Sequence, residues 1–119
     1  MDGKDFVRAI KELVKNSAVT TTIKNLESPP GRKPSEELVT LSSWYKQLDD
    51  TNKGMVKRVL DVVTDSSVFG FLAVLDGVRV IEDSSDKGDF ELYYINNENR
   101  ELLNDPEEEY LHDIYKSLE

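Results

Sequence analysis

Apolar residues recur at helical spacing in the first part of the chain. Between residues 5 and 15 they are Phe6, Ile10, Leu13 and Val14. These positions follow the i, i+4, i+7, i+8 pattern of a helix that buries one face. Acidic residues begin this segment and lysines end it, which suits the dipole of a helix. The spacing therefore predicts a first helix over residues 5–15.

Residues 16–34 interrupt this periodicity. Three prolines and a glycine stand between residues 29 and 34, and they are incompatible with regular structure. The threonines at 20–22 suit either an extended segment or a helix start, and Ile23 and Leu26 suit a short turn. We therefore expect residues 16–34 to form an irregular connection that contains proline.

Two further helices are expected after this connection. Ser35, followed by Glu36 and Glu37, has the chemistry of a helix N-terminus. Asp49 begins a third helix that ends near Thr64. The wide apolar stripe of this third helix predicts that it is central and buried. The residues expected to face inward are Leu38, Leu41, Tyr45 and Leu48 in the second helix and Met55, Val59, Val62 and Val63 in the third.

Residues 68–75 are compatible with two structures. Residues 65–67 have the composition of an N-cap, which makes the apolar run 68–75 a buried helix that ends at Gly77. The Asp76-Gly77 pair between two apolar runs is also a strong hairpin signal, which makes residues 68–75 a strand. The run shows little strict alternation, which favours the helix, and the strand stays open as the alternative.

The rest of the chain predicts strands and a closing helix. Residues 78–82 alternate in polarity, residues 90–95 are aromatic and apolar, and residues 100–103 suit a short third strand. They predict an antiparallel β-meander of two or three strands over about 78–103. Asp105, Pro106 and three glutamates then resemble the start of a closing C-terminal helix. Three or four N-terminal helices, a small meander and a closing helix predict an α+β fold.

Length and composition suit one small domain. The chain has 119 residues, of which 38% are hydrophobic and 33% charged. The hydrophobic residues suffice for a core, and a single domain over residues 1–119 is expected. It contains no cysteine. Disulfides, zinc–thiolate sites and thiol catalysis are therefore excluded.

Targeting signals are not recognisable in the sequence. The longest apolar run is residues 68–75, whereas a helix that crosses a bilayer needs about 20 apolar residues. The first residues lack the apolar centre of a signal peptide. We therefore expect a cytoplasmic location and no membrane partner.

Charge is distributed unevenly along the chain. The net charge is −9; residues 1–60 hold 11 Lys and Arg against 8 Asp and Glu, and residues 61–119 hold 4 against 16. Such a field disfavours nucleic-acid binding and favours a basic protein partner. The candidate partner-binding edge consists of the acidic residues around the predicted hairpin, Glu82, Asp83, Asp86, Asp89 and Glu91.

Residue types that support catalysis do not form a convincing set. His112 is the only histidine, and although Glu109 completes an E-x-x-H step, a di-iron site needs a second such step. We expect His112 to be a partly exposed helical residue. Asp61 and Asp65 lie four residues apart on one helix, but Asp65 is better explained as a helix cap.

Residues 83–89 resemble a calcium loop only at first sight. A loop that starts at Asp83 places Lys87 and Tyr94 at positions where ligands are required. A hairpin turn is the better account. We therefore predict no catalytic residue, no metal site and no cofactor, and a protein that is not an enzyme.

Three segments give the chain a likeness to known small proteins. They are LDGV at 75–78, LNDP at 103–106 and LHDIY at 111–115, with the predicted hairpin between them. In these segments, and in size, charge and element order, the chain resembles small acidic bacterial single-domain proteins, some of them immunity proteins of toxin–immunity systems. The resemblance implies binding to a protein and assigns no functional residue.

The leading hypothesis is an acidic protein–protein interaction module, in the manner of an immunity-type inhibitor that binds a basic partner. One alternative is a carboxylate-based, metal-dependent enzyme with His112 as its base. The other is an accessory subunit or homodimer with a structural role, in which the apolar residues 68–75 form part of the interface.

Overall fold

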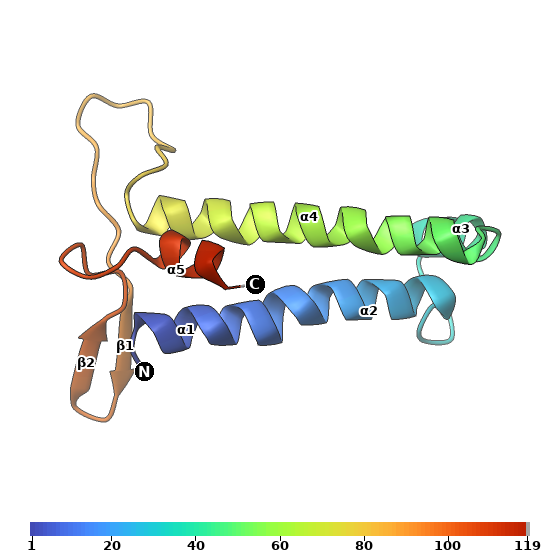
Figure 1. The fold of residues 1–119 in the computed structure, drawn as a ribbon, viewed down its shortest axis with the longest axis horizontal. Helices are drawn as coiled ribbons and strands as arrows, with labels where there is room; N and C mark the ends of the chain where they lie inside the picture. Colours follow the sequence, from blue (N-terminus) through green and yellow to red (C-terminus); the bar gives the residue numbers. More distant parts are fainter. Residues whose placement is uncertain (119) are drawn as a thin grey trace. The chain divides into compact units, whose positions relative to one another are not determined.

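The computed structural model describes residues 1–118, and its elements confirm the predicted α+β class (Figure 1). The chain groups into two compact units. The terminal unit consists of Met1–Leu13 and the segment from Ser66 onward, and the central unit of Val14–Asp65. The single domain expected over residues 1–119 stays a prediction.

The elements are α1 (Gly3–Ala9), the π-helical turn η1 (Ile10–Lys15), α2 (Asn16–Glu27), α3 (Glu36–Lys46), α4 (Asp50–Leu75), β1 (Tyr93–Asn96), β2 (Asn99–Leu102) and α5 (Leu111–Ser117).

Side-chain caps confirm the predicted starts of α3 and α4. The Ser35 hydroxyl accepts a hydrogen bond from the Leu38 amide at 3.2 Å. The Asp49 carboxylate accepts one from the Asn52 amide at 2.8 Å. Each cap satisfies an amide that has no partner within its own helix, which is why these residues begin the helices.

The expectation that residues 16–34 are irregular is wrong for their first part. Residues 16–27 form α2, and the chain leaves helical structure only at Ser28, just before the first proline. No glycine or proline interrupts residues 16–27. Burial of Val19 and Leu26 is favourable enough to outweigh the modest helix propensity of the threonines at 20–22.

Residues 65–67 do not begin a new helix, because α4 runs without interruption from Asp50 to Leu75. The helical alternative for residues 68–75 is therefore confirmed. Gly77 ends the helix at a positive φ of 77°. Its amide donates to the Val74 carbonyl and the Val78 amide to the Ala73 carbonyl, which is the Schellman arrangement that favours glycine.

The predicted meander is reduced to one hairpin. β1 and β2 pair antiparallel, with Tyr93 opposite Leu102. Residues 78–82 are not a strand, because Gly77 directs the chain away from α4 and no neighbouring strand pairs with them. The closing helix begins at Leu111 rather than at Pro106. The Asp105 carboxylate instead accepts a hydrogen bond from the Glu107 amide at 2.9 Å and closes a turn.

The core of the terminal unit is formed by α1, the end of α4 and α5. Its buried residues are Val7, Leu72, Leu111, Ile114 and Tyr115. α1 lies so close to α5 and to the residue after β2 that a side chain at Gly3 would meet the Leu111 side chain at 3.3 Å and the Leu103 carbonyl at 2.9 Å. Only glycine tolerates this approach.

Asn104 holds the irregular segment that follows α4. Its side-chain amide donates to the carbonyl of Leu75 at 2.7 Å and to that of Phe90 at 2.8 Å. Its side-chain oxygen accepts from the Leu92 amide at 2.8 Å. One buried side chain therefore replaces the missing strand pairing between the end of α4 and the segment that leads into β1.

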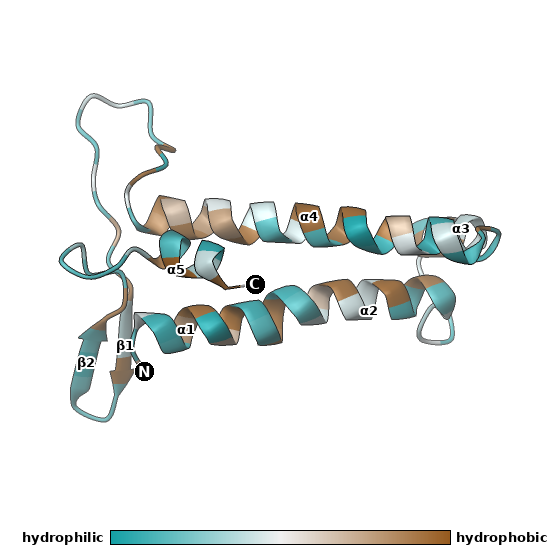
Figure 2. Cartoon of the chain, viewed as in Figure 1, coloured by the Kyte–Doolittle hydropathy of each residue, from teal (hydrophilic) through white to brown (hydrophobic). Residues whose placement is uncertain are grey.

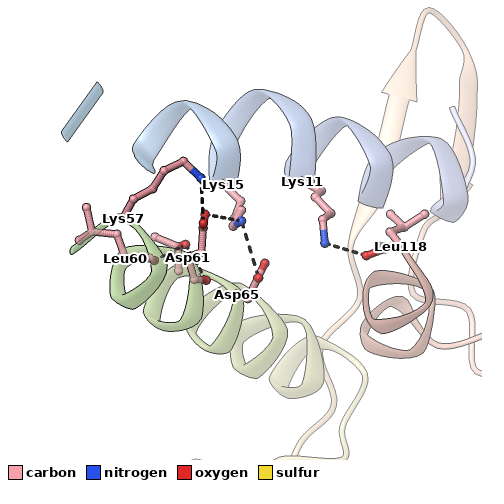
Figure 3. A network of polar contacts seen from close by, with 8 residues as sticks. Lys11, Lys15, Lys57, Leu60, Asp61, Asp65 and Leu118 are labelled. Carbon is pink, nitrogen blue, oxygen red and sulfur yellow. Dashed lines mark hydrogen bonds and ion pairs between the residues drawn. The ribbon is translucent and has the colours of Figure 1, made fainter. Parts of the chain in front are cut away.

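In the central unit, charged residues of α4 meet a buried lysine (Figure 3). The amine of Lys15, whose side chain is only 7% exposed, lies 3.0 Å from the Asp61 carboxylate and 3.6 Å from that of Asp65. Lys57 also pairs with Asp61 at 3.0 Å. On the same side of α4, the Lys53 amine lies 5.3 Å from the centre of the buried Tyr45 ring. A buried ammonium requires such partners, because its desolvation is otherwise costly.

The π-helical turn explains why Lys15, rather than an apolar residue, is buried. A π-turn holds more residues than an α-turn, so it shifts the buried face by about one position. Leu13 and Val14, which were expected to face inward, are exposed.

Replacing Asn104 with alanine is expected to destabilise the protein by about 2–4 kcal/mol, because buried partners of its three hydrogen bonds would be left unsatisfied. Urea unfolding followed by circular dichroism measures the loss, and faster exchange of the Leu92 amide locates it. The exposed Asn99→Ala variant is the control and should change stability by less than about 0.5 kcal/mol. Equal effects of the two substitutions would refute the role of Asn104.

The pairing of Asp61 is expected to make stability depend on pH. Hydrogen bonds from Lys57 and then from Lys15 lower the pKa of the Asp61 carboxyl. A pKa lowered by folding adds stability above the ordinary value of about 3.9, and this stability is lost as pH falls through the lowered pKa. Asp61→Asn should therefore be less stable than wild type at neutral pH, and the difference should vanish in strong acid. Urea unfolding followed by Trp44 fluorescence measures it, with Asp86→Asn as the control; a difference independent of pH contradicts the pairing.

Candidate interaction surfaces

The outward side of α4 in the central unit is apolar. Met55, Val59, Val62 and Val63 are all exposed, with Val59 at 60% and Val62 at 65%. We call these four residues the α4 outer face. The prediction that this stripe is buried is wrong. The ion pairs of Lys15 turn the charged side of α4 inward, and helical geometry then turns the valines outward. Figure 2 shows apolar and polar residues alternating along this helix.

An apolar recess adjoins the α4 outer face. It has a volume of about 380 Å³ and lies between α3 and α4. Trp44 and Leu48 line it from one side, and Met55, Val56 and Val59 from the other. Trp44 itself is half exposed. Large exposed apolar patches of this kind mark interaction sites on soluble proteins.

The five predicted edge residues lie together on one exposed segment, but not on a hairpin. Glu82, Asp83, Asp86, Asp89 and Glu91 all belong to the irregular stretch between α4 and β1. We call residues 82–91 the acidic segment. Glu82 accepts a hydrogen bond from the Gly88 amide at 3.1 Å, which closes the segment into a loop. Glu91 accepts one from the Tyr93 hydroxyl at 2.5 Å, and this bond raises the pKa of Tyr93.

A second acidic area of the terminal unit is an open recess of about 580 Å³. Two basic residues, Lys4 and Arg100, line it. The carboxylates that line it are those of Asp2, Glu101, Asp105, Glu108 and Glu109. Among the described residues, no group of three or more His, Asp or Glu is placed to hold a metal ion. The recess is thus lined by side chains of both charges.

His112 is paired with a buried aspartate that the sequence did not indicate. The Asp76 carboxylate, fully buried, accepts a hydrogen bond from the His112 amide at 2.9 Å and lies 2.6 Å from its Nδ1. The imidazole stacks on Tyr110 and meets the edge of Phe69. Asp76 thus caps the start of α5 from the end of α4, a connection across 36 residues with no local signal.

Two of the carboxylates considered for metal binding or acid–base work have a structural contact. Asp61 and Asp65 both contact Lys15, and Asp65 lies inside α4 rather than at the start of a helix. The i, i+4, i+8 series of Lys57, Asp61 and Asp65 is visible in the sequence, and it was the available signal for a charged inner side. No helix in the described part of the chain is long and apolar enough to cross a bilayer.

Comparison with protein-family models, with curated proteins and with solved structures found no match to this chain. The resemblance to immunity-type proteins stays a prediction.

Replacing His112 with alanine is expected to destabilise the terminal unit by about 2–4 kcal/mol, because the buried Asp76 carboxylate would lose its closest partner. A double-mutant cycle with Asp76→Asn should give a coupling energy above about 1 kcal/mol. Asp113, which lies 3.4 Å from Nε2 and is exposed, supplies the control Asp113→Asn. Additive effects of the His112 and Asp76 substitutions would show that the pair is not coupled.

Proposed function

We propose that this chain is a protein-interaction module that binds a helical protein surface through the α4 outer face. The observation that carries the proposal is the orientation of α4, whose charged side binds Lys15 while its valines are exposed. In a chain that acts alone, burial of these valines would be favourable by about 1.5–3 kcal/mol each. The exposed orientation is expected where another protein supplies the missing contacts.

The chemistry of the partner follows from the shape and charge of this surface. The apolar side of one helix fits against that of another, because their side chains interdigitate along a common axis. The recess beside Trp44 accepts one or two apolar side chains. Along α4 the basic Arg58 precedes the acidic Asp65, so the preferred partner helix carries an acidic and a basic residue where they meet these two side chains.

A second candidate function uses the acidic segment to bind a basic protein. Its five acidic residues are exposed, and so are the apolar residues Val80, Ile81 and Phe90 of the same stretch. Charge would speed the encounter with a basic partner, and the apolar side chains would supply contact area. This is the binding mode that the sequence favoured, and Asn104 fixes the end of the segment that carries it.

Photo-crosslinking in cells that produce the protein tests both candidates. A photoreactive amino acid at Val63 reports on the α4 outer face, one at Ser85 on the acidic segment, and one at the exposed Thr21 of α2 is the control. We expect a discrete adduct from position 63 and none above background from position 21, because crosslinking requires a protein held close to the probe.

The outcomes separate the two candidates. Adducts at position 63 support the α4 outer face. Adducts at position 85 alone support the acidic segment and contradict the first proposal, and their loss in Asp83→Asn, Asp86→Asn, Asp89→Asn would assign them to charge. Equal labelling at all three positions contradicts both. The mass of the adduct tells whether the partner is a second copy or another protein.

A further inference from the structure

The outward residues of α4 follow a heptad repeat. Met55, Val59, Val62 and Ser66 are separated by four, three and four residues, which is the spacing of alternating d and a positions. Val59 and Ser66 occupy the a positions, and Met55 and Val62 the d positions. The repeat extends over about three turns of an exposed helix face, so it describes a seam for a second helix.

We infer that the second helix is α4 of another copy of this chain, and that the two helices run antiparallel. The inference rests on the proposed function, because it names the partner of the α4 outer face. The two copies are related by a two-fold axis, so both use the same surface and make the same contacts.

The antiparallel order brings opposite charges together. Arg58 and Asp65 occupy the two g positions beside the seam. When Val59 lies opposite Val62 of the second copy, Arg58 of each copy lies next to Asp65 of the other. The Asp65 side chain contacts Lys15 at 3.6 Å and is 41% exposed, so a guanidinium of the second copy would share this carboxylate with the partners that it already has. Two symmetric ion pairs therefore flank the seam.

The parallel order lacks this complementarity. In a parallel pair each g position lies beside an e position of the other helix, which places Arg58 next to the apolar Val63. Charge therefore selects the antiparallel order over the parallel one.

The recess beside Trp44 fits the same arrangement. Val56, which lines this recess, occupies an e position, and in the antiparallel pair its neighbour is Val63 of the second copy. Val62 and Val63 of each copy then enter the recess of the other, where they meet Trp44 and Met55. In this two-fold pair, the second copy covers all four residues of the α4 outer face.

Sedimentation equilibrium of the full chain tests the inference. The wild type should sediment at about 27 kDa, twice the chain mass of 13.6 kDa. Val59→Glu together with Val62→Glu should raise the dissociation constant by about a hundredfold or more, because both charges would be buried in the seam. The matched control is Ile95→Glu, which alters an apolar residue of similar exposure, 62%, on the hairpin and should leave the dimer intact.

Charge exchange between copies tests the orientation. Arg58→Glu alone and Asp65→Lys alone should each weaken the dimer by about tenfold, because like charges become neighbours. An equimolar mixture of the two variants should recover it, since each antiparallel heterodimer again contains two opposite-charge contacts. Circular dichroism of each variant checks that the Asp65→Lys chain, which also loses a contact to Lys15, is folded.

The results separate this inference from the proposal on which it rests. A wild-type chain that stays a monomer at every concentration, or mixing without recovery, overturns the second-copy, antiparallel assignment. If the chain is a monomer while the crosslink at position 63 yields an adduct with another protein, the interaction function stands and its partner is different. If the chain is a monomer and position 63 yields no adduct, both fail.

Discussion

The contact of the Lys15 amine with Asp61 and Asp65 decides which side of α4 is turned toward the interior of the central unit. Once a buried ammonium occupies that place, its partners must be carboxylates, and they stand four residues apart on one side of the helix. Another side of the same helix holds Met55, Val59 and Val62, which are exposed. The orientation of α4 about its own axis therefore determines two things together: Asp61 and Asp65 pair with Lys15, and the apolar residues are exposed.

The terminal unit follows a different principle. Long-range hydrogen bonds there compensate for scarce regular structure: Asn104 ties the end of α4 to the stretch before β1, and Asp76 joins the same helix end to the start of α5. Each is a short buried polar side chain, and its removal would leave buried partners unsatisfied, so each costs much to remove. These contacts position the acidic segment without any strand to support it.

Local chemistry made part of this structure predictable, and long-range contacts made the rest unpredictable. The caps Ser35 and Asp49 and the stop at Gly77 depend on a few neighbouring residues, and all three were recognised in the sequence. The face of α4 was misassigned because apolar spacing reveals that a helix has two sides, but not which side its neighbours cover. The π-turn before Lys15 and the pairing of Asp76 with His112 have no local signature. The five acidic residues lie on one exposed irregular segment rather than on a hairpin, and their role as a partner-binding edge stays a prediction.

The central claim is that the exposed side of α4 is the seam of an antiparallel pair, and a distance between two copies tests it most directly. The chain has no cysteine, so Thr51→Cys provides a single site for a spin label at the exposed start of α4. In an antiparallel pair centred between residues 60 and 61, the two labels lie about 30 Å apart along the helix axis. Pulsed dipolar spectroscopy should therefore give a distribution near that value. A distribution near 10 Å, the spacing of two parallel helices, or the absence of any dipolar coupling would contradict the account.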